Sequence, residues 1–497
     1  MSDVLVPLPI VIPLFAAALT VMFARFRVVQ RAIALLSLTS VVGVAVALLI
    51  HVDDESVVTM DAGAWPAPLG ITFVVDRLSA IMVLTSSVML LVVLLYAVGQ
   101  RGVERDHPAF HPIYLVLAAG VSASFITGDM FNLFVAFEMM LAASYVLLTL
   151  GGRPDQVRAG MTYVVISLVA SSMFIAALAL LYAATGTVNM ADLALRIPEL
   201  SSGVRAGFSL LLIFVFGIKA GLFPLFFWLP DSYPTAPGPV TAIFAGLLTK
   251  VGVYAIIRTQ TLLFPIDSQQ GTMLLIIAGL TMLIGVLGAL AQDDLKRALT
   301  FHIISQIGYM IFGLGLFTIA GITAVVFYIV QTILVKTNLF LVAGLIDRHA
   351  GQSRISKAGG IARSAPIIAV FFAVPALSLA GLPPSSGFAG KFALVDAGVG
   401  SQQWWIVTVA LVVSLLTLFS MTKIWAGMFW GEPEAAPVAP DPHAGGPGVM
   451  VFATGITVAL SVAFVVFAGP MYELAERAGS DLMNPSVYID AVLGVDR

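Results

Sequence analysis

The sequence has no cysteine and few charged residues. Of its 497 residues none is Cys, only 10% are Asp, Glu, Lys or Arg, and the formal net charge is −3. The lack of cysteine excludes disulfides, iron–sulfur clusters and thiolate metal sites. A net charge this close to zero gives no indication of nucleic acid as a partner.

Motifs for cofactor chemistry are missing as well. No glycine-rich loop ends in Lys-Ser or Lys-Thr, so the sequence offers no phosphate-binding loop. We predict no cofactor, no bound metal and no catalytic residues, and therefore a protein that is not an enzyme.

Long apolar runs are what the sequence has instead. Hydrophobic residues make up 60% of the chain, and the mean hydropathy is +1.03. Both values are typical of a polytopic membrane protein embedded in lipid. About fourteen runs are long enough to cross a bilayer, near 3–24, 31–50, 72–98, 110–127, 130–150, 159–184, 206–228, 239–261, 271–291, 298–317, 320–346, 364–399, 403–428 and 449–470. We expect an all-α protein that forms a single membrane domain over 1–497.

Five ionisable residues lie deep inside these runs. They are Glu138, Lys219, Lys250, Lys336 and Lys391. A charge near the bilayer centre costs at least a few kcal/mol, so it faces protein or water and marks a candidate functional site. Each lysine alone could be structural, but together they predict a proton path within the membrane plane. Proximity of Glu138 to Lys219 would favour the charged ammonium, and their separation would release a proton.

A histidine accompanies this path. His302 begins the segment FHIISQIGYM at 301–310, in the tenth run. Histidine changes charge near neutral pH and can relay protons. It can equally be a structural residue bonded to a backbone carbonyl, and the sequence leaves both readings open.

Prolines interrupt two of the runs. Pro224 breaks the seventh run, and Pro383 and Pro384 break the twelfth, each within a similar segment: AGLFP at 220–224 and AGLPP at 380–384. Paired broken helices are typical of transporters built from internal repeats. Their separation by five runs predicts two inverted five-helix repeats, helices 4–8 at 110–261 and helices 9–13 at 271–428. Helices 1–3 at 1–109, helix 14 at 449–470 and a short external tail at 471–497 would flank them, with a surface helix at 471–482.

The basic residues predict the orientation. Segments after odd-numbered runs hold fourteen Lys and Arg residues, and segments after even-numbered runs hold six. Because basic residues favour the cytoplasmic side, both termini are expected outside the cytoplasm of a prokaryotic plasma membrane.

Four segments resemble a known superfamily. They are WLPDSYPTAPGPVTAIFAGLLTKVGVYAIIR (228–258), LKRALTFHIISQIGYM (295–310), VKTNLFLVAGLI (335–346) and GLPPSSGFAGKF (381–392). They are similar to the antiporter-like subunits shared by respiratory complex I, membrane-bound hydrogenases and Mrp cation/proton antiporters. FEMMLAASYVLL (137–148), with DSYPTAPGPV and VKTNLFL, is most similar to the D-type subunits of the multisubunit Mrp sodium/proton antiporters.

The resemblance implies a fold, a role and partners. The implied fold has fourteen helices with discontinuous helices 7 and 12, and the family's glutamate and lysines map onto Glu138, Lys219, Lys250, Lys336 and Lys391. The implied role is proton translocation beside the other subunits of a complex that exchanges protons for a cation, with Na⁺ as the expected cation. The alternatives are the same module in complex I or a hydrogenase, which copurifying redox proteins would reveal, and a solute permease, which would need a roomy central cavity.

Overall fold

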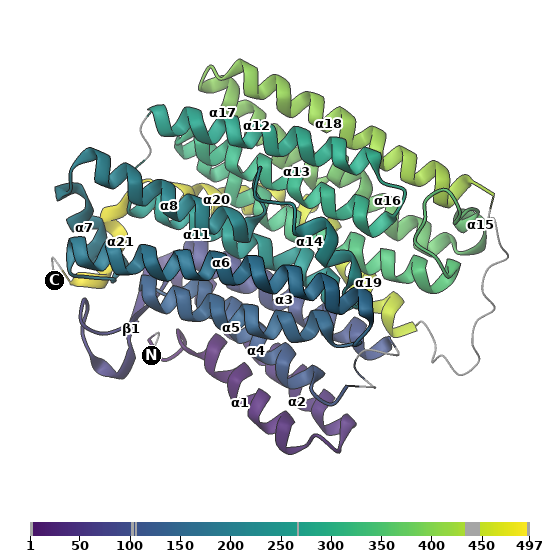
Figure 1. Ribbon diagram of the computed structural model, residues 1–497, viewed down its shortest axis with the longest axis horizontal. Helices are drawn as coiled ribbons and strands as arrows, with labels where there is room; N and C mark the ends of the chain where they lie inside the picture. Colours follow the sequence, from purple (N-terminus) through teal and green to yellow (C-terminus); the bar gives the residue numbers. More distant parts are fainter. Residues whose placement is uncertain (1–2, 101–103, 105–106, 266–267, 433–447, 495–497) are drawn as a thin grey trace.

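The computed structural model describes residues 3–100, 104, 107–265, 268–432 and 448–494, and these form an elongated bundle of helices (Figure 1). The first half contains α1 (Leu8–Met22), α2 (Arg27–Glu55), α3 (Arg77–Gly99), α4 (Phe110–Ile126), α5 (Met130–Thr149), α6 (Pro154–Thr185), α7 (Met190–Arg196), α8 (Ser202–Ala220), α9 (Leu229–Ser232), α10 (Gly238–Ile243) and α11 (Thr249–Leu262). The second half contains α12 (Ser268–Ala291), α13 (Leu295–Leu316), α14 (Ile319–Ala350), α15 (Ile361–Ser364), α16 (Pro366–Ala380), α17 (Ser386–Gly400), α18 (Trp404–Trp425), α19 (Gly448–Val466), α20 (Ala468–Leu482) and α21 (Pro485–Leu493).

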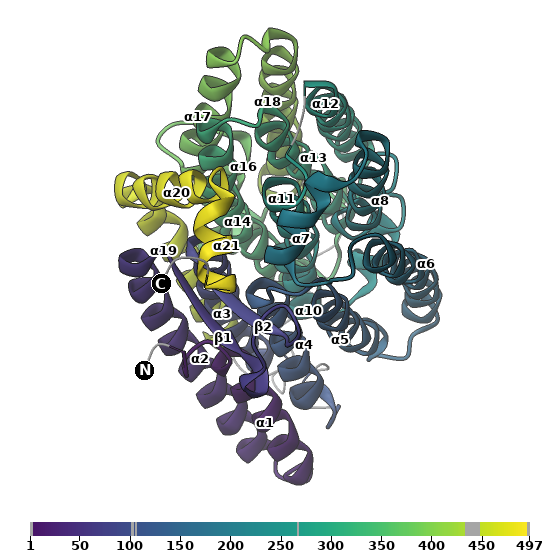
Figure 2. The same cartoon turned by 90° about the vertical axis from the view of Figure 1, so that its left-hand side faces the viewer.

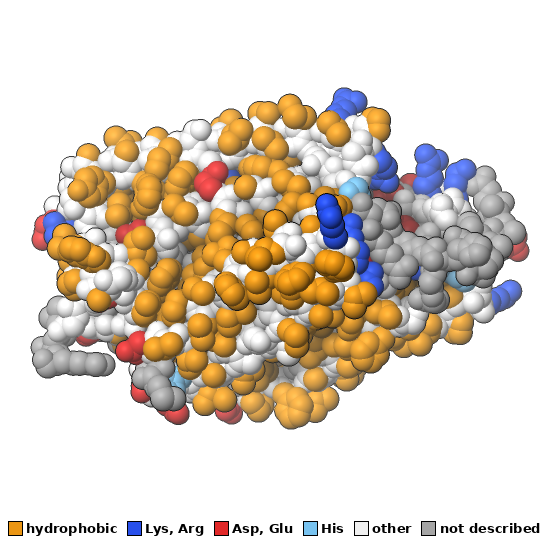
Figure 3. Space-filling view, turned by 90° about the horizontal axis from the view of Figure 1, so that it is seen from below, with side chains coloured by type: hydrophobic (Ala, Val, Ile, Leu, Met, Phe, Trp, Pro, Cys, Tyr) orange, Lys and Arg blue, Asp and Glu red, His pale blue; other side chains and the backbone are white. Residues whose placement is uncertain are grey.

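The helices match the predicted all-α membrane class. Within the described residues, eleven helical stretches are long and apolar enough to cross a membrane, and α1, α4 and α16 are shorter apolar helices. Large apolar side chains on α6 and α18, such as Leu180 and Phe419, are well exposed. Apolar side chains also cover the middle of the face in Figure 3. Such a surface is suited to lipid, because the bilayer interior is the solvent in which exposed apolar side chains are favourable. The exact number of spans stays a prediction.

The long helix α14 lies at the centre of the bundle. It packs against α3, α10, α13, α16, α17, α19 and α20, and Figure 2 shows it surrounded by them. A helix that is apolar on all sides and buried on all sides belongs in a core. Lys336 is therefore carried by a helix that is enclosed by its neighbours along most of its length.

Acidic residues fix where several helices begin. Asp76 precedes α3 and accepts a hydrogen bond from the backbone N of Ser79, and Asp129 precedes α5 and accepts one from Asn132. A side-chain oxygen at this position satisfies one of the backbone N–H groups that a helix start leaves unpaired.

The structure breaks the two proline-containing helices at the predicted places, and it breaks them alike. After α8 the chain turns at Gly221 (φ 82°, ψ 43°), and after α16 it turns at Gly381 (φ 82°, ψ 40°). Left-handed residues of this kind suit glycine and end a helix. A cis peptide bond follows in each case, before Pro224 and between Pro383 and Pro384. The division into two inverted repeats stays a prediction.

One end of the bundle holds elements that the periodicity did not indicate. The antiparallel strands β1 (Val57–Asp61) and β2 (Thr72–Asp76) pair from Val57 opposite Asp76 to Asp61 opposite Thr72. The short helix α7 lies at the same end (Figure 2). The expected surface helix at 471–482 is present as α20. α20 and α21 pack on the bundle and bury residues such as Leu482 and Tyr488.

Candidate functional site

The residues Glu138, Lys219, Lys250, Lys336 and Lys391 are called the row below. The first end of the row lies between α5, α6 and α8. Ser171 of α6 donates a short hydrogen bond to Oε1 of Glu138, and Nζ of Lys219 donates to Oγ of the same serine at 3.2 Å. The ammonium also donates to the carbonyl of Ser167 at 3.1 Å. The Ser171 hydroxyl therefore connects Glu138 and Lys219. Among the described residues no direct ion pair joins the two side chains.

Lys219 and Lys250 are carried by two helices that cross at close range. A Cβ atom on Gly252 of α11 would lie 2.7 Å from the backbone N of Ala220 in α8. Only glycine therefore permits this approach. The backbone of Phe244–Leu248, just before α11, forms a π-helical turn, and Nζ of Lys250 donates to the carbonyl of Ala245 at 2.5 Å. Such turns shift the regular hydrogen bonding and leave carbonyls available.

Lys336 occupies the middle of the row. Its side chain is fully buried, and its Nζ has no hydrogen-bonding partner among the described residues. Lys250 and Lys391 are both near enough to act on it electrostatically, and Lys336 acts in turn on His302. An ammonium without partners cannot stay charged in a dry interior. Lys336 is therefore either neutral or solvated by water.

Lys391 forms the second end, and the broken twelfth helix supplies its partners. Its Nζ donates to the carbonyls of Leu379 and Ala380 at 2.9 and 3.3 Å, which are the last carbonyls of α16. It also donates to Oγ of Ser414 at 3.2 Å and lies 4.9 Å from the ring centre of Tyr309. The C-terminus of a helix carries partial negative charge and stabilises a cation there. The side chain of Lys391 is buried.

His302 lies inside α13 and beside the row. Its Nε2 is 2.9 Å from Oγ of Ser420 on α18, and its Nδ1 has no partner among the described residues. The alternative of a carbonyl-bound histidine at a helix start is not what is found. A ring nitrogen without a partner leaves one side of the imidazole available for water or a proton.

Serines complete the site, and the sequence reasoning missed them. Ser167 and Ser171 stand one helical turn apart in an apolar helix, which places both hydroxyls on one face. That spacing was a usable signal. Ser414 and Ser420 are six residues apart on α18, and nothing in their spacing indicates which lysine or histidine they meet.

A buried ionic cluster lies apart from the row, in the segment between α3 and α4. Glu104 pairs with Arg31 at 2.7 Å and with Nε2 of His111 at 3.0 Å. Burial alone would raise the pKa of Glu104, but the hydrogen bonds and charges of His111 and Arg31 outweigh it and lower that pKa to about 2. His111 follows His107 at a spacing found in metal sites, yet the described residues contain no group of three metal-ligating side chains.

These features define a class. A multi-pass helical membrane protein with a buried row of amines, a carboxylate and hydroxyls is an ion-translocating membrane protein. The NADH:quinone oxidoreductase/Mrp antiporter transmembrane model matches residues 127–417, more than half of the chain. The chain belongs to this family.

Individual relatives match this chain over nearly its whole length. The D-type Na⁺/H⁺ antiporter subunit of Alkalihalophilus pseudofirmus is 43% identical over 491 residues, covering 98% of this chain and 99% of the relative. A chain in the structure of the Mrp complex from Dietzia sp. superposes with a TM-score of 0.92 at 33% identity, covering 99% of both chains. A chain of an archaeal membrane-bound sulfane sulfur reductase superposes with a TM-score of 0.89 at 26% identity, again covering 99% of both.

Proposed function

We propose that the chain is the proton-translocating subunit of a multisubunit Na⁺/H⁺ antiporter. In this proposal protons move between Glu138–Lys219 at one end and Lys391 at the other, through Lys250 and Lys336. The observation that carries it is the continuity of the row: each neighbouring pair shares a bridging hydroxyl, a close helix crossing or electrostatic contact.

The size of the spaces beside the row favours protons as cargo. The cavity next to Lys219, lined also by Ser167 and Tyr233, has a volume of about 10 Å³. This is room for roughly one water molecule. A solute permease would require a far larger cavity at its centre, so that alternative is disfavoured.

The charge of the row bears on the route of the metal cation. Several amines in one low-dielectric row repel Na⁺ whenever they hold protons. Na⁺ is therefore proposed to cross elsewhere in the complex, at an interface with other subunits. This division agrees with the names of the relatives, which are subunits of larger assemblies.

We further propose that both termini lie outside the cytoplasm. In Figure 3, Lys and Arg gather mostly at the right-hand end, whereas Figure 1 places both termini toward the left. Basic residues favour the cytoplasmic side, so the end with β1, β2 and α21 is called the outer end below.

A second candidate is the same module in a redox-driven complex. The likeness to the sulfane sulfur reductase chain supports it, since that assembly is a respiratory complex. Copurification of iron–sulfur or flavin proteins with the chain would favour this candidate. Proton exchange driven by Na⁺ alone would favour the antiporter.

The test is exchange by the purified complex in liposomes. Lys219→Met, Lys250→Met and Lys391→Met are each expected to abolish Na⁺-dependent dissipation of a pH gradient while the complex stays assembled. Lys423→Met is the matched control, because Lys423 also donates to backbone carbonyls, at Leu290 and Gln292, but lies apart from the row. Exchange that survives all three changes would overturn the proposed function.

A further inference from the structure

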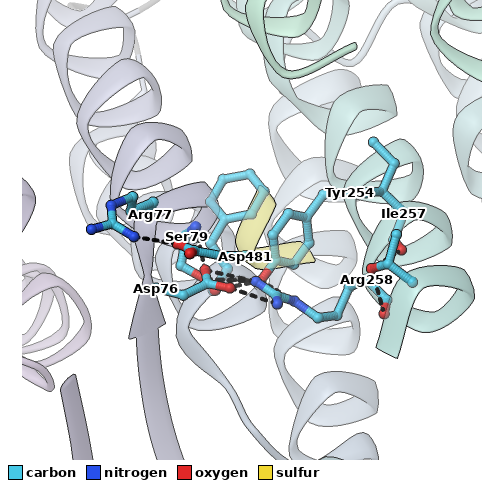
Figure 4. Close-up of polar contacts among 9 residues, drawn as sticks. Asp76, Arg77, Ser79, Tyr254, Ile257, Arg258 and Asp481 are labelled. Carbon is cyan, nitrogen blue, oxygen red and sulfur yellow. Dashed lines mark hydrogen bonds and ion pairs between the residues drawn. The ribbon is translucent and has the colours of Figure 1, made fainter. Parts of the chain in front are cut away.

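A buried ion pair at the outer end of α11 has no role in the row described above. Asp76, which ends β2, meets Arg258 of α11 through two contacts, Oδ2 to Nη1 at 2.7 Å and Oδ1 to Nη2 at 2.8 Å (Figure 4). Both residues are 4% exposed. Removing two charges from water is costly even when they pair, and apolar side chains would often be as stable. A pair in this position therefore invites a functional explanation.

Two tyrosines enclose the guanidinium. The Arg258 carbon Cζ lies 5.4 Å from the ring centre of Tyr254 and 5.3 Å from that of Tyr488. Tyr488 belongs to α21, so the C-terminal helix covers the pair. The electron-rich faces of both rings stabilise the buried cation.

The pair is linked back toward the row. Lys250, Tyr254 and Arg258 are spaced by four residues on α11, so they follow one face of the helix. The Tyr254 hydroxyl donates to the carbonyl of Phe125 at 2.7 Å, lies 3.1 Å from Oγ of Ser79 and is 3.3 Å from Nη2 of Arg258. Hydroxyls in sequence can accept a proton on one side and release another on the other side.

The pair also opens outward. A cavity of about 10 Å³ is lined by Asp76, Arg258, Asp481 and Tyr488. That volume holds roughly one water molecule. Asp481 of α20 lies on its outer side, where it pairs with Arg77 at 2.5 Å and is partly exposed. Asp481 thus stands between the buried pair and the outer solution.

We propose that this cluster is a gated proton outlet that connects Lys250 with the outer solution, with Asp76 as the proton acceptor and Arg258 as the gate. The inference rests on the proposed function. The Lys250 ammonium gives up a proton, through water, to the Tyr254 hydroxyl, which turns from the Phe125 carbonyl and passes its own proton by way of Ser79 to the Asp76 carboxylate. Lys250 becomes a neutral amine, Asp76 a neutral acid, and the acid then releases the proton to the cavity water.

The gating follows from charge. Burial alone would raise the pKa of Asp76, but the charge and hydrogen bonds of Arg258 outweigh it and hold that pKa below its usual range. While Arg258 is paired, Asp76 stays ionised and does not take the proton. When Arg258 moves toward Asp481 across the small cavity, burial favours the protonated acid, and the outlet opens.

Removing single hydroxyls tests the outlet without disturbing any charge. Tyr254→Phe is expected to slow Na⁺-driven proton exchange by at least about tenfold, because a proton-relaying group is lost. Tyr114→Phe is the matched control: Tyr114 is also fully buried and also donates to a backbone carbonyl, that of Leu90, but lies away from the cluster. It should exchange at the wild-type rate.

A second variant keeps the outlet testable if Tyr254→Phe prevents assembly of the complex. Ser79→Ala removes the next hydroxyl on α3 and should also slow exchange, whereas Ser86→Ala on the same helix should not, because Ser86 only bonds the carbonyl of Val83. Wild-type exchange by assembled Tyr254→Phe or Ser79→Ala, or equal losses in variants and controls, would overturn the outlet. Lys219→Met separates the two proposals. If it abolishes exchange while the hydroxyl variants do not, only the outlet is wrong; if exchange survives Lys219→Met, Lys250→Met and Lys391→Met alike, the proposed function falls and the outlet with it.

Discussion

Ser171→Ala is the substitution that most directly tests how Glu138 and Lys219 communicate. The hydroxyl donates to the carboxylate and accepts from the ammonium at 3.2 Å, so its loss removes two hydrogen bonds to charged groups. Hydrogen bonds to charged partners contribute about 1.5–3 kcal/mol each. If one such bond is needed to transfer the proton, exchange should slow roughly ten- to a hundredfold, at about 1.4 kcal/mol per factor of ten.

The assay is Na⁺-dependent decay of an imposed pH gradient in liposomes that contain the purified complex. Ser172→Ala is the control, because the side chain of this neighbouring serine is exposed on another face of α6. Ser171→Thr keeps a hydroxyl and should restore most of the rate. The reasoning is refuted if Ser171→Ala and Ser172→Ala exchange protons equally fast in fully assembled complexes.

Three further changes address stability. Gly252→Ala would place a Cβ atom 2.7 Å from the backbone N of Ala220. The free energy of unfolding, measured by thermal melting of the complex in detergent, should therefore fall by about 1–3 kcal/mol. Gly207→Ala is the control and should be neutral, because a Cβ atom there would contact nothing within 4 Å. The pKa of Glu104 is lowered from 4.5 to about 2, so its pairing with Arg31 and His111 stabilises the fold above pH 4.5. This contribution is lost as the pH falls toward 2. Glu104→Gln should remove this pH dependence of stability from acid unfolding curves. Burial raises the pKa of Asp129 from 3.8 to about 6, so the stability of the fold should decrease as the pH rises through this range. Asp129→Asn removes the charge and can still cap α5. This variant should therefore be more stable than wild type at pH 8 in the same melting assay.

The sequence predicted the parts of the site that depend on a single position. A lysine within an apolar run is visible without any tertiary structure, because its cost in lipid depends only on depth. The broken helices were visible for the same local reason: Pro224 and Pro384 cannot continue a helix. The capping position of Asp129 before α5 likewise depends on the residues beside it.

The remaining parts depend on which helices meet. The bridge at Ser171 exists because α6 lies between α5 and α8, and no local pattern states that order. Arg258 lies near a helix end, yet it is buried beside Asp76, which β2 brings to it from 182 positions away. The hairpin itself was missed, since β1 and β2 are only five residues each and adjoin apolar helices.

The hydrogen bonding along the row is uneven, and this unevenness bears on transport. Lys219 has two hydrogen-bonding partners on α6, and Lys391 has partners that include the last carbonyls of α16, which ends at Gly381. Lys336, between them, has none among the described residues. A proton is therefore held well at the two ends and poorly in the middle, because an unsolvated buried ammonium is strongly disfavoured. If protons pass along the row as proposed, water must enter beside Lys336, and the breaks after α8 and α16 are places where the backbone can shift to admit it.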